Sequence, residues 1–580
     1  MLRASIAAGA LLLAAGGYAA VQRRLRVQRE EYAALVAGLA APERYRDAAL
    51  VLVVDVGSSS IRASCYALVD AATGRALGRR PCAAARAAVE WVMLQGSLTQ
   101  LPMNAVINAA GEAALDQIER AVESVIDRTL EFVRAAGLAG QLRGVGFSTF
   151  AMNLVGVDAK GAPVTPVYTV RSRARCSGRR PSTALYARRL RELLAEKGAL
   201  DDCHDRTGAM IHPAYASAEF FRLHHEEPNT VARVHRWQSI TSYLFRKWML
   251  AGDRPLPMSF TEASWTGLLD VRRGVWDGPL LELVGMPLDK MPDVQDSRVP
   301  VSGLRPSFAR RWTELADVPF FLGIGDGAAA NVGSKCVDSS RIAVTIGTSA
   351  ALRVVLGDDA LERRRVPKGL WCYRIGDSRV LLGGALNDGG SVFQFFCQTL
   401  QLRPEDADTE LRKLRPAQHG LCVLPFLSGE RAPGWRDDAT CAITGINKWT
   451  KPLHLLQAAM ESVATRLALV FALVAEYADS DATIIASGTA LTSSRAWRQM
   501  LADNIGRELV LETCATEATS RGVAVFLGSY LGLHTLEETA TLPDDKDAFD
   551  RSHPNVGAHA AYLEARRQQE TLYRKLFDDC

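Results

Sequence analysis

The clearest pattern in the chain is an apolar run that ends in a turn of small residues and is followed at once by a second apolar run. It occurs at residues 50–54 and 63–68, and again at residues 341–346 and 350–356. Apolar, β-branched runs separated by Gly, Ser or Thr are typical of two strands joined by a hairpin turn. The repetition predicts a duplicated architecture of two related α/β halves.

Helical spacing of apolar residues is the other main pattern. Residues 110–136 and 452–477 are predicted to form long helices, and residues 391–400 a shorter one that follows a Gly-rich loop. Further short apolar runs predict strands at residues 142–148, 154–158 and 484–486. Strands that alternate with helices are typical of the α/β class.

The length of 580 residues exceeds the size at which one hydrophobic core stops growing, so two large domains are expected. The expected segments are an apolar N-terminal segment at 1–29, a connector at 30–49, a first lobe at 50–315, a second lobe at 316–540 and a peripheral charged tail at 541–580.

Composition and charge exclude some classes of protein. With 48% hydrophobic and 23% charged residues the chain is ordinary for a globular protein, and a net charge of +4 predicts no nucleic-acid partner. The 11 cysteines include no Cys-x-x-Cys pair, which argues against a zinc site and for a reducing compartment.

The N-terminus is unusual because residues 4–21 carry no charge and are followed by arginines at positions 23, 24, 26 and 29. Such a run is close to the lower limit for a bilayer span, and the trailing arginines would keep the rest of the chain on the cytoplasmic side. A single membrane anchor is therefore expected. The alternatives are a cleaved organelle-targeting peptide, since no acidic residue precedes Glu30, and a secretory signal.

A candidate catalytic carboxylate follows the apolar run at residues 320–324. The run ends in Gly325, Asp326 and Gly327, after which small residues begin a predicted helix. A carboxylate at such a junction would lie beside helix-terminal N–H groups at the mouth of a cleft, where it could accept a proton from a substrate hydroxyl. The alternative is an N-cap aspartate on an ordinary strand-to-helix turn.

The first hairpin turn carries groups suited to phosphate. Successive N–H groups and hydroxyls that can form a nest for phosphate oxygens come from Gly57, Ser58, Ser59 and Ser60. Arg62 adds positive charge, and Asp55 could hold Mg²⁺ through water, because magnesium keeps much of its hydration shell. The alternative is a Ser/Gly turn without function.

Taken together, several segments resemble the FGGY carbohydrate kinases, and their gluconokinase-like branch in particular, over residues 50–535. The segments that carry the resemblance are residues 55–62, 325–327, 347–349, 390–394, 427–435, 445–461 and 487–489. Residues 55–62 and 347–349 resemble the family's two phosphate hairpins, and residues 325–327 resemble its catalytic carboxylate loop. Residues 487–489 resemble its adenosine-binding turn.

The resemblance implies two actin- and hexokinase-like (ribonuclease H-like) α/β lobes that close on ATP and a sugar, sugar acid or polyol in the cleft between them. Asp326 would be the catalytic base, and Asp55 would guide Mg²⁺. Contacts to ATP are implied for Gly57, Ser58, Ser59, Ser60, Arg62, Gly347, Thr348, Gly390, Gln394, Gly488 and Thr489. Contacts to the sugar are implied for Phe150, Met152, Asp326, Glu430 and Arg431.

The sequence departs from the family pattern on the sugar side. Ala151 and Met152 stand where close relatives usually carry Trp and His, and residues 170–173 stand where they carry a Trp-x-Asp-x-Arg stretch. Removing these groups deprives sugar hydroxyls of hydrogen-bond partners and opens volume. We therefore expect weaker phosphorylation of free gluconate than of a bulkier or more acidic polyol.

Two functions stay open at this point. One is ATP-dependent phosphorylation of a sugar, sugar acid or polyol hydroxyl, with a gluconate-like substrate favoured. The other is a membrane-tethered pseudokinase that binds nucleotide without turning over sugar. The expected partners are ATP, Mg²⁺, a small sugar or sugar acid, a second copy of the chain in a homodimer, and a membrane contacted through residues 4–21. The expected location is the cytoplasmic face of a membrane, or an organelle after cleavage.

Overall fold

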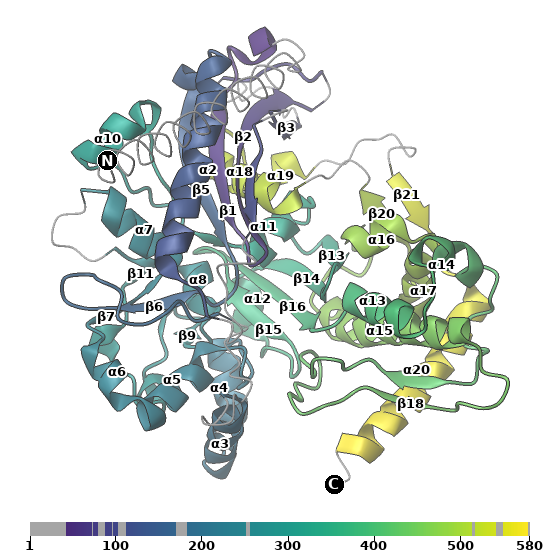
Figure 1. Ribbon diagram of the computed structural model, residues 1–580. Coiled ribbons are helices and arrows are strands. Elements are labelled where there is room, and N and C mark those ends of the chain that lie inside the picture. The colour runs from purple at the N-terminus through teal and green to yellow at the C-terminus, as the bar shows by residue number, and fades with distance from the viewer. Residues whose placement is uncertain are drawn as a thin grey trace, which may run out of the picture.

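The structure is a computed structural model that describes residues 42–71, 73–78, 88–94, 97–102, 112–169, 183–250, 256–512, 517–540 and 549–577. The apolar N-terminal segment, most of the connector and residues 170–173 lie outside the described residues. Within them the chain forms two α/β lobes, each built on its own sheet (Figure 1).

The sheet of the first lobe has the order β12-β5-β1-β2-β3, with β4 paired to β2. Its strands are β1 (Leu50–Val56), β2 (Ser60–Asp70), β3 (Val89–Met93), β4 (Thr99–Pro102), β5 (Leu142–Thr149) and β12 (Ile324–Gly325). β1 and β2 form an antiparallel hairpin, whereas β1 pairs with β5 and β5 with β12 in parallel. The hairpin predicted from the first pair of apolar runs is confirmed.

The sheet of the second lobe repeats this order as β15-β16-β14-β13-β19-β20-β21. Its strands are β13 (Arg341–Ile346), β14 (Ala350–Gly357), β15 (Trp371–Arg374), β16 (Arg379–Leu386), β19 (Thr483–Ser487), β20 (Leu509–Glu512) and β21 (Phe549–Ser552). The hairpin β13–β14 again has a parallel neighbour, β19, on its other side. The predicted duplication is therefore confirmed at the level of sheet topology.

Alternation along β1 explains how the first sheet is covered. Leu50, Leu52 and Val54 pack in a cluster with α2, whereas Val51 and Val53 pack in a second cluster that reaches the other lobe. Both faces are buried because helices lie on both sides of the sheet. The helices of the first half are α2 (Leu115–Ala135), α3 (Thr183–Glu196), α4 (Leu200–Thr207), α5 (Ala216–Glu226), α6 (Pro228–Arg233), α7 (Ile240–Trp248), α8 (Phe260–Ser264), α9 (Gly278–Leu283), α10 (Pro306–Arg311) and α11 (Asp326–Gly333).

The predicted long helices are confirmed, with ends that differ by a few residues: α2, α13 and α15 correspond to residues 110–136, 391–400 and 452–477. The helices of the second half are α12 (Asp359–Arg363), α13 (Gly390–Thr399), α14 (Pro404–Leu411), α15 (Pro452–Ala475), α16 (Thr489–Ser493), α17 (Arg495–Ile505), α18 (Ala518–Tyr530), α19 (Leu536–Thr539) and α20 (Val556–Phe577). Short strands outside the two main sheets are β6 (Leu154–Val157), β7 (Arg236–Ser239), β8 (Met258–Ser259), β9 (Leu269–Asp270), β10 (Val275–Trp276), β11 (Val294–Gln295), β17 (Cys422–Leu424) and β18 (Ala442–Thr444).

Helix α15 is long and apolar enough to cross a membrane, and among the described residues it is the one helix that meets this test. Its most apolar window is 78% buried inside the protein, where it packs in the core of the second lobe. The hydrophobicity of α15 is therefore that of a core helix.

The lobe boundary expected at residue 316 is wrong, because two segments that follow this residue, β12 and α18, belong to the first lobe. β12 completes the first sheet, and α18 packs on β1 and β5. α11 and α18 cross at Gly333 and Gly522, where an added Cβ would lie 1.8 Å from a backbone oxygen of the other helix. Glycine is needed at this crossing because no side chain fits between the two backbones.

The expectation of a peripheral tail at 541–580 is also wrong. β21 pairs with β20 at the edge of the second sheet, and α20 packs on α17 and β17. Tyr562 and Gln569 of α20 are buried, and the Tyr562 hydroxyl donates to Glu461 at 2.9 Å. The charged composition of this segment belongs to its exposed face, while its other face is part of the second lobe.

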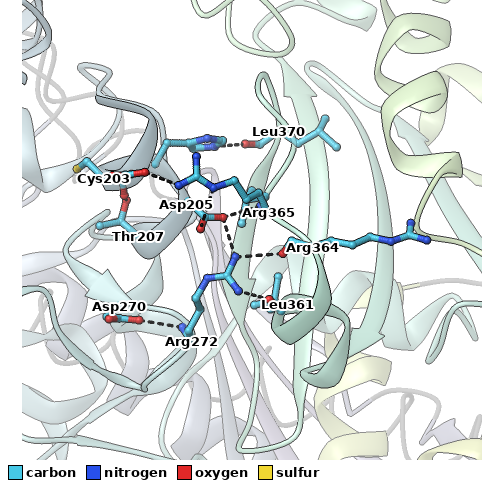
Figure 2. Close-up of polar contacts among 12 residues, drawn as sticks. Cys203, Asp205, Thr207, Asp270, Arg272, Leu361, Arg364, Arg365 and Leu370 are labelled. Carbon is cyan, nitrogen blue, oxygen red and sulfur yellow. Dashed lines mark hydrogen bonds and ion pairs between the residues drawn. The ribbon is translucent and has the colours of Figure 1, made fainter. Parts of the chain in front are cut away.

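A polar seam joins the lobes beside α4 and α12 (Figure 2). Arg272 donates to the Asp205 carboxylate at 2.7 Å and to the backbone oxygen of Arg364 at 3.1 Å. The His204 ring contacts the backbone oxygen of Leu370 at 2.8 Å. Because these groups come from both lobes, they fix one side of the interlobe junction.

Candidate active site

Two carboxylates lie at the carboxyl ends of neighbouring strands in the first sheet. Asp55 is near the end of β1 and pairs with Ser148 of β5, which in turn pairs with Ile324 of β12, just before Asp326. Burial raises the pKa of both carboxyls, and the charge of Asp326 contributes to raising the pKa of Asp55 to about 7. Asp326 is the first residue of α11, so both interpretations made from the sequence, a helix-start residue and a carboxylate beside a cleft, describe the same position.

Asp55 fits a cation. Its Oδ1 atom is buried and has no hydrogen-bond partner among the described residues. The structured part of the chain contains no group of three or more His, Cys, Asp or Glu side chains arranged to hold a metal. A magnesium ion here would therefore depend on Asp55, water and phosphate oxygens, which is the ligand set that Mg²⁺ prefers beside nucleotides.

The turn of the first hairpin is closed by the N–H of Gly57, which donates to the backbone oxygen of Ser60 at 3.0 Å. Ser58 is half-buried and Ser59 is exposed, so this turn can be reached by a ligand. Arg62 donates to the Ser60 hydroxyl at 2.9 Å and forms an ion pair with Glu517. Arg62 therefore stabilises the turn through Ser60, and its charge is balanced by the Glu517 carboxylate.

The second hairpin turn is tied to the start of α13. The N–H of Gly390 donates to Gly347 O at 2.7 Å, and the N–H of Gly389 donates to Thr348 O at 2.9 Å. The Thr348 side chain is exposed. Gly488 has a φ of +92°, and an added Cβ would lie 2.4 Å from the backbone oxygen of Ile346, so glycine is required where this turn approaches β13.

A cavity of about 470 Å³ lies beside these turns. Its volume is within the range of small-molecule and cofactor sites. It is lined by Gly347, Thr348, Gly390, Phe393, Gln394, Cys397, Gln398, Leu402, Pro404, Thr489, Ala490, Ser493, Ser494 and Trp497. The structure thus brings together Gly347, Thr348, Gly390, Gln394 and Thr489, which the sequence predicted as ATP contacts and which come from three separate segments.

The residues predicted to contact the sugar do not line one common cavity in the way that the predicted ATP contacts do. Phe150 and Met152 are 3% and 2% exposed, and they pack in two different apolar clusters. Glu430 is 1% exposed and accepts hydrogen bonds from Arg466, from Gly434 N at 3.2 Å and from the Tyr573 hydroxyl at 2.6 Å. These three side chains therefore serve packing and internal bonding in this structure, which corrects the expectation that they face a sugar.

Arg431, also predicted as a sugar contact, is half-buried and donates to Leu386 O at 3.1 Å. It lies close enough to Asp326 for its charge to lower the pKa of that carboxyl, as does the charge of Arg353 on β14. Sequence reasoning missed Arg353, although a charged residue within the apolar run 350–356 was a signal that could have found it.

A pair of tyrosines spans the lobes next to these arginines, and sequence reasoning missed it as well. The hydroxyls of Tyr215, which precedes α5, and Tyr373 of β15 are 2.6 Å apart. Trp265 packs edge-on against Tyr373, and Trp371 stacks on Tyr373 with ring centres 4.4 Å apart. Aromatic rings and tyrosine hydroxyls beside a carboxylate and two guanidinium groups suit a polar ligand with apolar C–H faces.

Behind the β12–α11 junction lies a buried carboxylate, Glu262, surrounded by hydroxyls. It accepts hydrogen bonds from Ser239 and Thr241 at 2.9 Å and from Thr149 at 3.3 Å, and the Ser259 hydroxyl oxygen lies 3.3 Å from it. Ser259 donates this hydroxyl to the backbone oxygen of Gly323 at 2.6 Å, two residues before Gly325. Because hydroxyl donors only partly offset burial, the pKa of Glu262 is raised to about 7.

We expect Glu262 to make the protein less stable as pH rises from about 4.5 to about 7. The folded protein holds this proton more tightly than the unfolded chain does, so stability is greatest below the unfolded pKa and falls as pH increases through the folded pKa, by on the order of 3 kcal/mol. Melting temperatures of wild type and Glu262→Gln at pH 5 and pH 8 would measure this. The variant should lose less stability over this interval, whereas Glu410→Gln at the surface should behave as wild type; equal slopes for Glu262→Gln and wild type would contradict the assignment.

Two sheets with matching hairpin turns, a carboxylate where they meet and a cavity beside the second turn define an α/β phosphotransferase of the two-lobed kind. Residues 93–333 match the N-terminal domain of the FGGY family of carbohydrate kinases, and residues 342–530 match its C-terminal domain. The chain belongs to this family and is an ATP-dependent carbohydrate kinase. This supports the enzyme over the pseudokinase considered from the sequence.

Three known proteins illustrate the similarity. The gluconokinase of Bacillus subtilis (strain 168) is 25% identical over 444 residues, which cover 74% of this chain and 80% of that protein. The gluconokinase of Bacillus licheniformis is 27% identical over 389 residues, 64% of this chain and 71% of that protein. The crystal structure of gluconate kinase from Lactobacillus acidophilus superimposes with a TM-score of 0.74 at 19% identity, covering 91% of this chain and 98% of that chain. The structural match confirms the predicted actin- and hexokinase-like fold.

Proposed function

We propose that this kinase phosphorylates a hydroxyl of a gluconate-like sugar acid, with Asp326 as the catalytic base. The observation that carries the proposal is the position of Asp326, half-buried at the start of α11 and within the electrostatic reach of two arginines, Arg353 and Arg431. Two of the similar proteins named above are gluconokinases, which supports an acid over a neutral sugar.

In the proposed reaction the substrate hydroxyl gives its proton to the Asp326 carboxylate as its oxygen attacks the γ-phosphorus of ATP. The bond between the γ-phosphorus and the β–γ bridging oxygen breaks, so the products are a phosphate ester and ADP. Phosphoryl transfer requires little covalent chemistry from the protein, which positions the groups and balances charge. Burial raises the pKa of Asp326 in the direction of neutral pH, and a general base is most effective when its pKa lies near the working pH.

ATP is proposed to lie with its base in the cavity lined by Gln394 and Thr489 and its phosphates toward the two hairpin turns at Ser58 and Thr348. The exposed side chains of Ser59 and Thr348, one at each turn, support this orientation. Mg²⁺, held through Asp55 and water, would neutralise phosphate charge when bound. The orphaned Oδ1 of Asp55 supports this role.

The experiment that tests the proposed function is sugar-stimulated ADP release by the full-length protein. A panel of gluconate, larger sugar acids, glycerol, xylulose and ribulose would be compared at saturating Mg·ATP. We expect the highest kcat/KM on a sugar acid, and on an acid bulkier than gluconate because Ala151 stands where close relatives usually carry the larger Trp. Preference for glycerol or a pentulose over every acid would refute the substrate class while leaving the kinase activity standing.

We also propose that residues 4–21 anchor the protein on the cytoplasmic face of a membrane, on the basis of their uncharged run and its arginine flank. The full-length protein should remain in the membrane fraction after carbonate extraction. A chain that begins at Pro42 should be recovered in the supernatant with the same kcat. Full-length protein that carbonate releases with its N-terminus intact would refute the anchor, and a shortened mature N-terminus would favour an organelle-targeting peptide.

The homodimer stays a prediction that sedimentation analysis would test.

A further inference from the structure

Arg353 occupies an unusual position on β14. Its neighbours on the same face by strand alternation are Ala351 and Val355, and Val355 packs in the apolar cluster between the lobes together with Trp371 and Tyr373. Leu352 on the opposite face packs in the core of the second lobe. A guanidinium on a face that otherwise buries apolar side chains costs free energy, so it requires a compensating partner.

Among the described residues, Asp326 is the only carboxylate whose charge stabilises the Arg353 guanidinium among the main causes of its pKa, and no group is bonded to it directly. Arg353 makes neither a hydrogen bond nor an ion pair with the structured parts of the chain, and its side chain is half-buried rather than solvent-exposed. Its Nε lies 3.7 Å from the point where a Cβ on Gly327 would stand, in the first turn of α11. The Arg353 guanidinium therefore points toward the segment that begins with Asp326. Its N–H groups make no hydrogen bond to the described residues.

Arg431 approaches the same place from another loop of the second lobe. One of its nitrogens donates to Leu386 O at 3.1 Å, while its Nε is buried and has no partner among the described residues. Burial lowers the pKa of both guanidinium groups, and the charge of Arg431 further lowers the pKa of Arg353. Two cations that repel each other are thus held beside one carboxylate, Asp326.

The other carboxylate near Arg431 is Asp388, and it is already engaged. It accepts from the hydroxyls of Ser391 and Ser428 at 3.1 Å and from Ser428 N at 2.8 Å. The spare donors of Arg353 and Arg431 therefore suit an anion that arrives with a ligand. Planar guanidinium groups bind carboxylates and phosphates well because they can donate two parallel hydrogen bonds.

Two ligands could bring that anion, the γ-phosphate of ATP or a carboxylate of the phosphate acceptor. Arg353 lies four residues beyond Ser349 along β14, so its backbone is roughly 13 Å from the phosphate turn. Its Nε lies beside Gly327, Tyr373 is close enough to affect its pKa, and it does not line the cavity that contains Gln394 and Thr489. This position of Arg353 favours the acceptor, whereas Arg431 lies nearer the turn, because it donates to Leu386 O and Leu386 pairs with Ala350.

We propose that Arg353 and Arg431 form an anion subsite that binds the carboxylate of a sugar acid and so determines the specificity of this kinase for acids over neutral polyols. The inference rests on the proposed function, and it assigns a role to Arg353 that the sequence motifs did not. Arg353 supplies the free donors, and Arg431 adds charge and the donor of its buried Nε.

The test uses the full-length protein and measures kcat/KM with paired acceptors, an acid and the neutral alditol of the same carbon number, such as gluconate and sorbitol. Arg353→Gln should lower kcat/KM on the acid by at least about 30-fold, mainly through KM, because a charge-assisted pair is lost. It should change kcat/KM on the alditol and the KM for ATP by less than threefold. Arg379→Gln, on the neighbouring strand β16 and paired with Glu537, is the matched control and should change neither.

Equal losses on acid and alditol would overturn the proposal, and a rise in the KM for ATP with both acceptors would assign the arginines to the γ-phosphate. Arg353→Lys keeps the positive charge but lacks the planar guanidinium group, and it should recover part of the activity on the acid. If Arg353→Gln has a lower melting temperature than wild type, Arg353→Lys provides the test instead. If wild type turns over no acceptor, the proposed function fails. The subsite is then decided by calorimetric titration of gluconate into wild type and Arg353→Gln with a non-hydrolysable ATP analogue, and equal affinities would overturn it.

Discussion

Asp326→Asn is expected to reduce phosphoryl transfer by about 10²–10⁴-fold, which is the usual contribution of a general base. The amide keeps the size of the carboxylate at the start of α11 but cannot accept the hydroxyl proton. Because the predicted ATP contacts at Thr348, Gln394 and Thr489 lie in a separate cavity, the affinity for ATP should stay nearly unchanged. Single-turnover kinetics and equilibrium binding of a fluorescent ATP analogue would measure the two effects separately.

Two further variants make this result specific. Thr348→Val removes an exposed hydroxyl at the second hairpin turn and should raise the KM for ATP with a smaller effect on kcat. Asp317→Asn changes an exposed carboxylate shortly before β12 and should leave all constants as in wild type. Turnover by Asp326→Asn within a few-fold of wild type would remove Asp326 from the mechanism.

Arg466→Met is expected to destabilise the protein by about 3–5 kcal/mol, because it leaves the buried Glu430 carboxylate without its counter-charge. The side chains of Arg466 and Glu430 are 4% and 1% exposed. Arg466 also lies over the rings of Phe426 and Tyr573, at 5.3 and 5.0 Å from their centres, so its loss removes packing as well as charge. The melting temperature and the urea midpoint of unfolding would measure the loss.

The same variant should raise the KM for the sugar, since Glu430 directly precedes Arg431 and anchors the loop that carries it. Lys413→Met is the matched control: Lys413 is exposed and pairs with Glu410, and such surface pairs contribute little. A normal melting temperature combined with loss of sugar binding would instead restore Glu430 to a direct role in the sugar site.

The backbone conformation of the turns proposed to bind the nucleotide was predicted well because each turn is a local structure. A Gly-rich turn after an apolar run specifies a hairpin through backbone conformation alone, and Gly488, which must approach β13 closely, is specified in the same way. The residues 347–349, 390–394 and 487–489 each form one such local unit, so the sequence predicts their conformation independently of the cavity that they surround.

The surroundings of the proposed sugar contacts were predicted less well because they are made by contacts between distant segments. Tyr215 and Tyr373 are 158 positions apart, and Tyr573 and Glu430 are 143 positions apart. Neither pair belongs to a local pattern, so Glu430 was expected to contact the sugar and Arg353 was not singled out at all. The burial of Met152 in an apolar cluster depends likewise on helices far along the chain.

The sequence by itself determined the two duplicated hairpins, the long helices, the Gly–Asp–Gly junction at Asp326 and the turns at residues 347–349 and 487–489, because alternation, helical periodicity and glycine turns act over a few residues. Only the tertiary structure decided that α18 and β12 complete the first lobe, that α20 supports the Glu430 loop, and that Arg353 and Arg431 meet beside Asp326. Those outcomes depend on which distant surfaces pack together, and side-chain burial and charge balance at such junctions are properties of the folded chain as a whole.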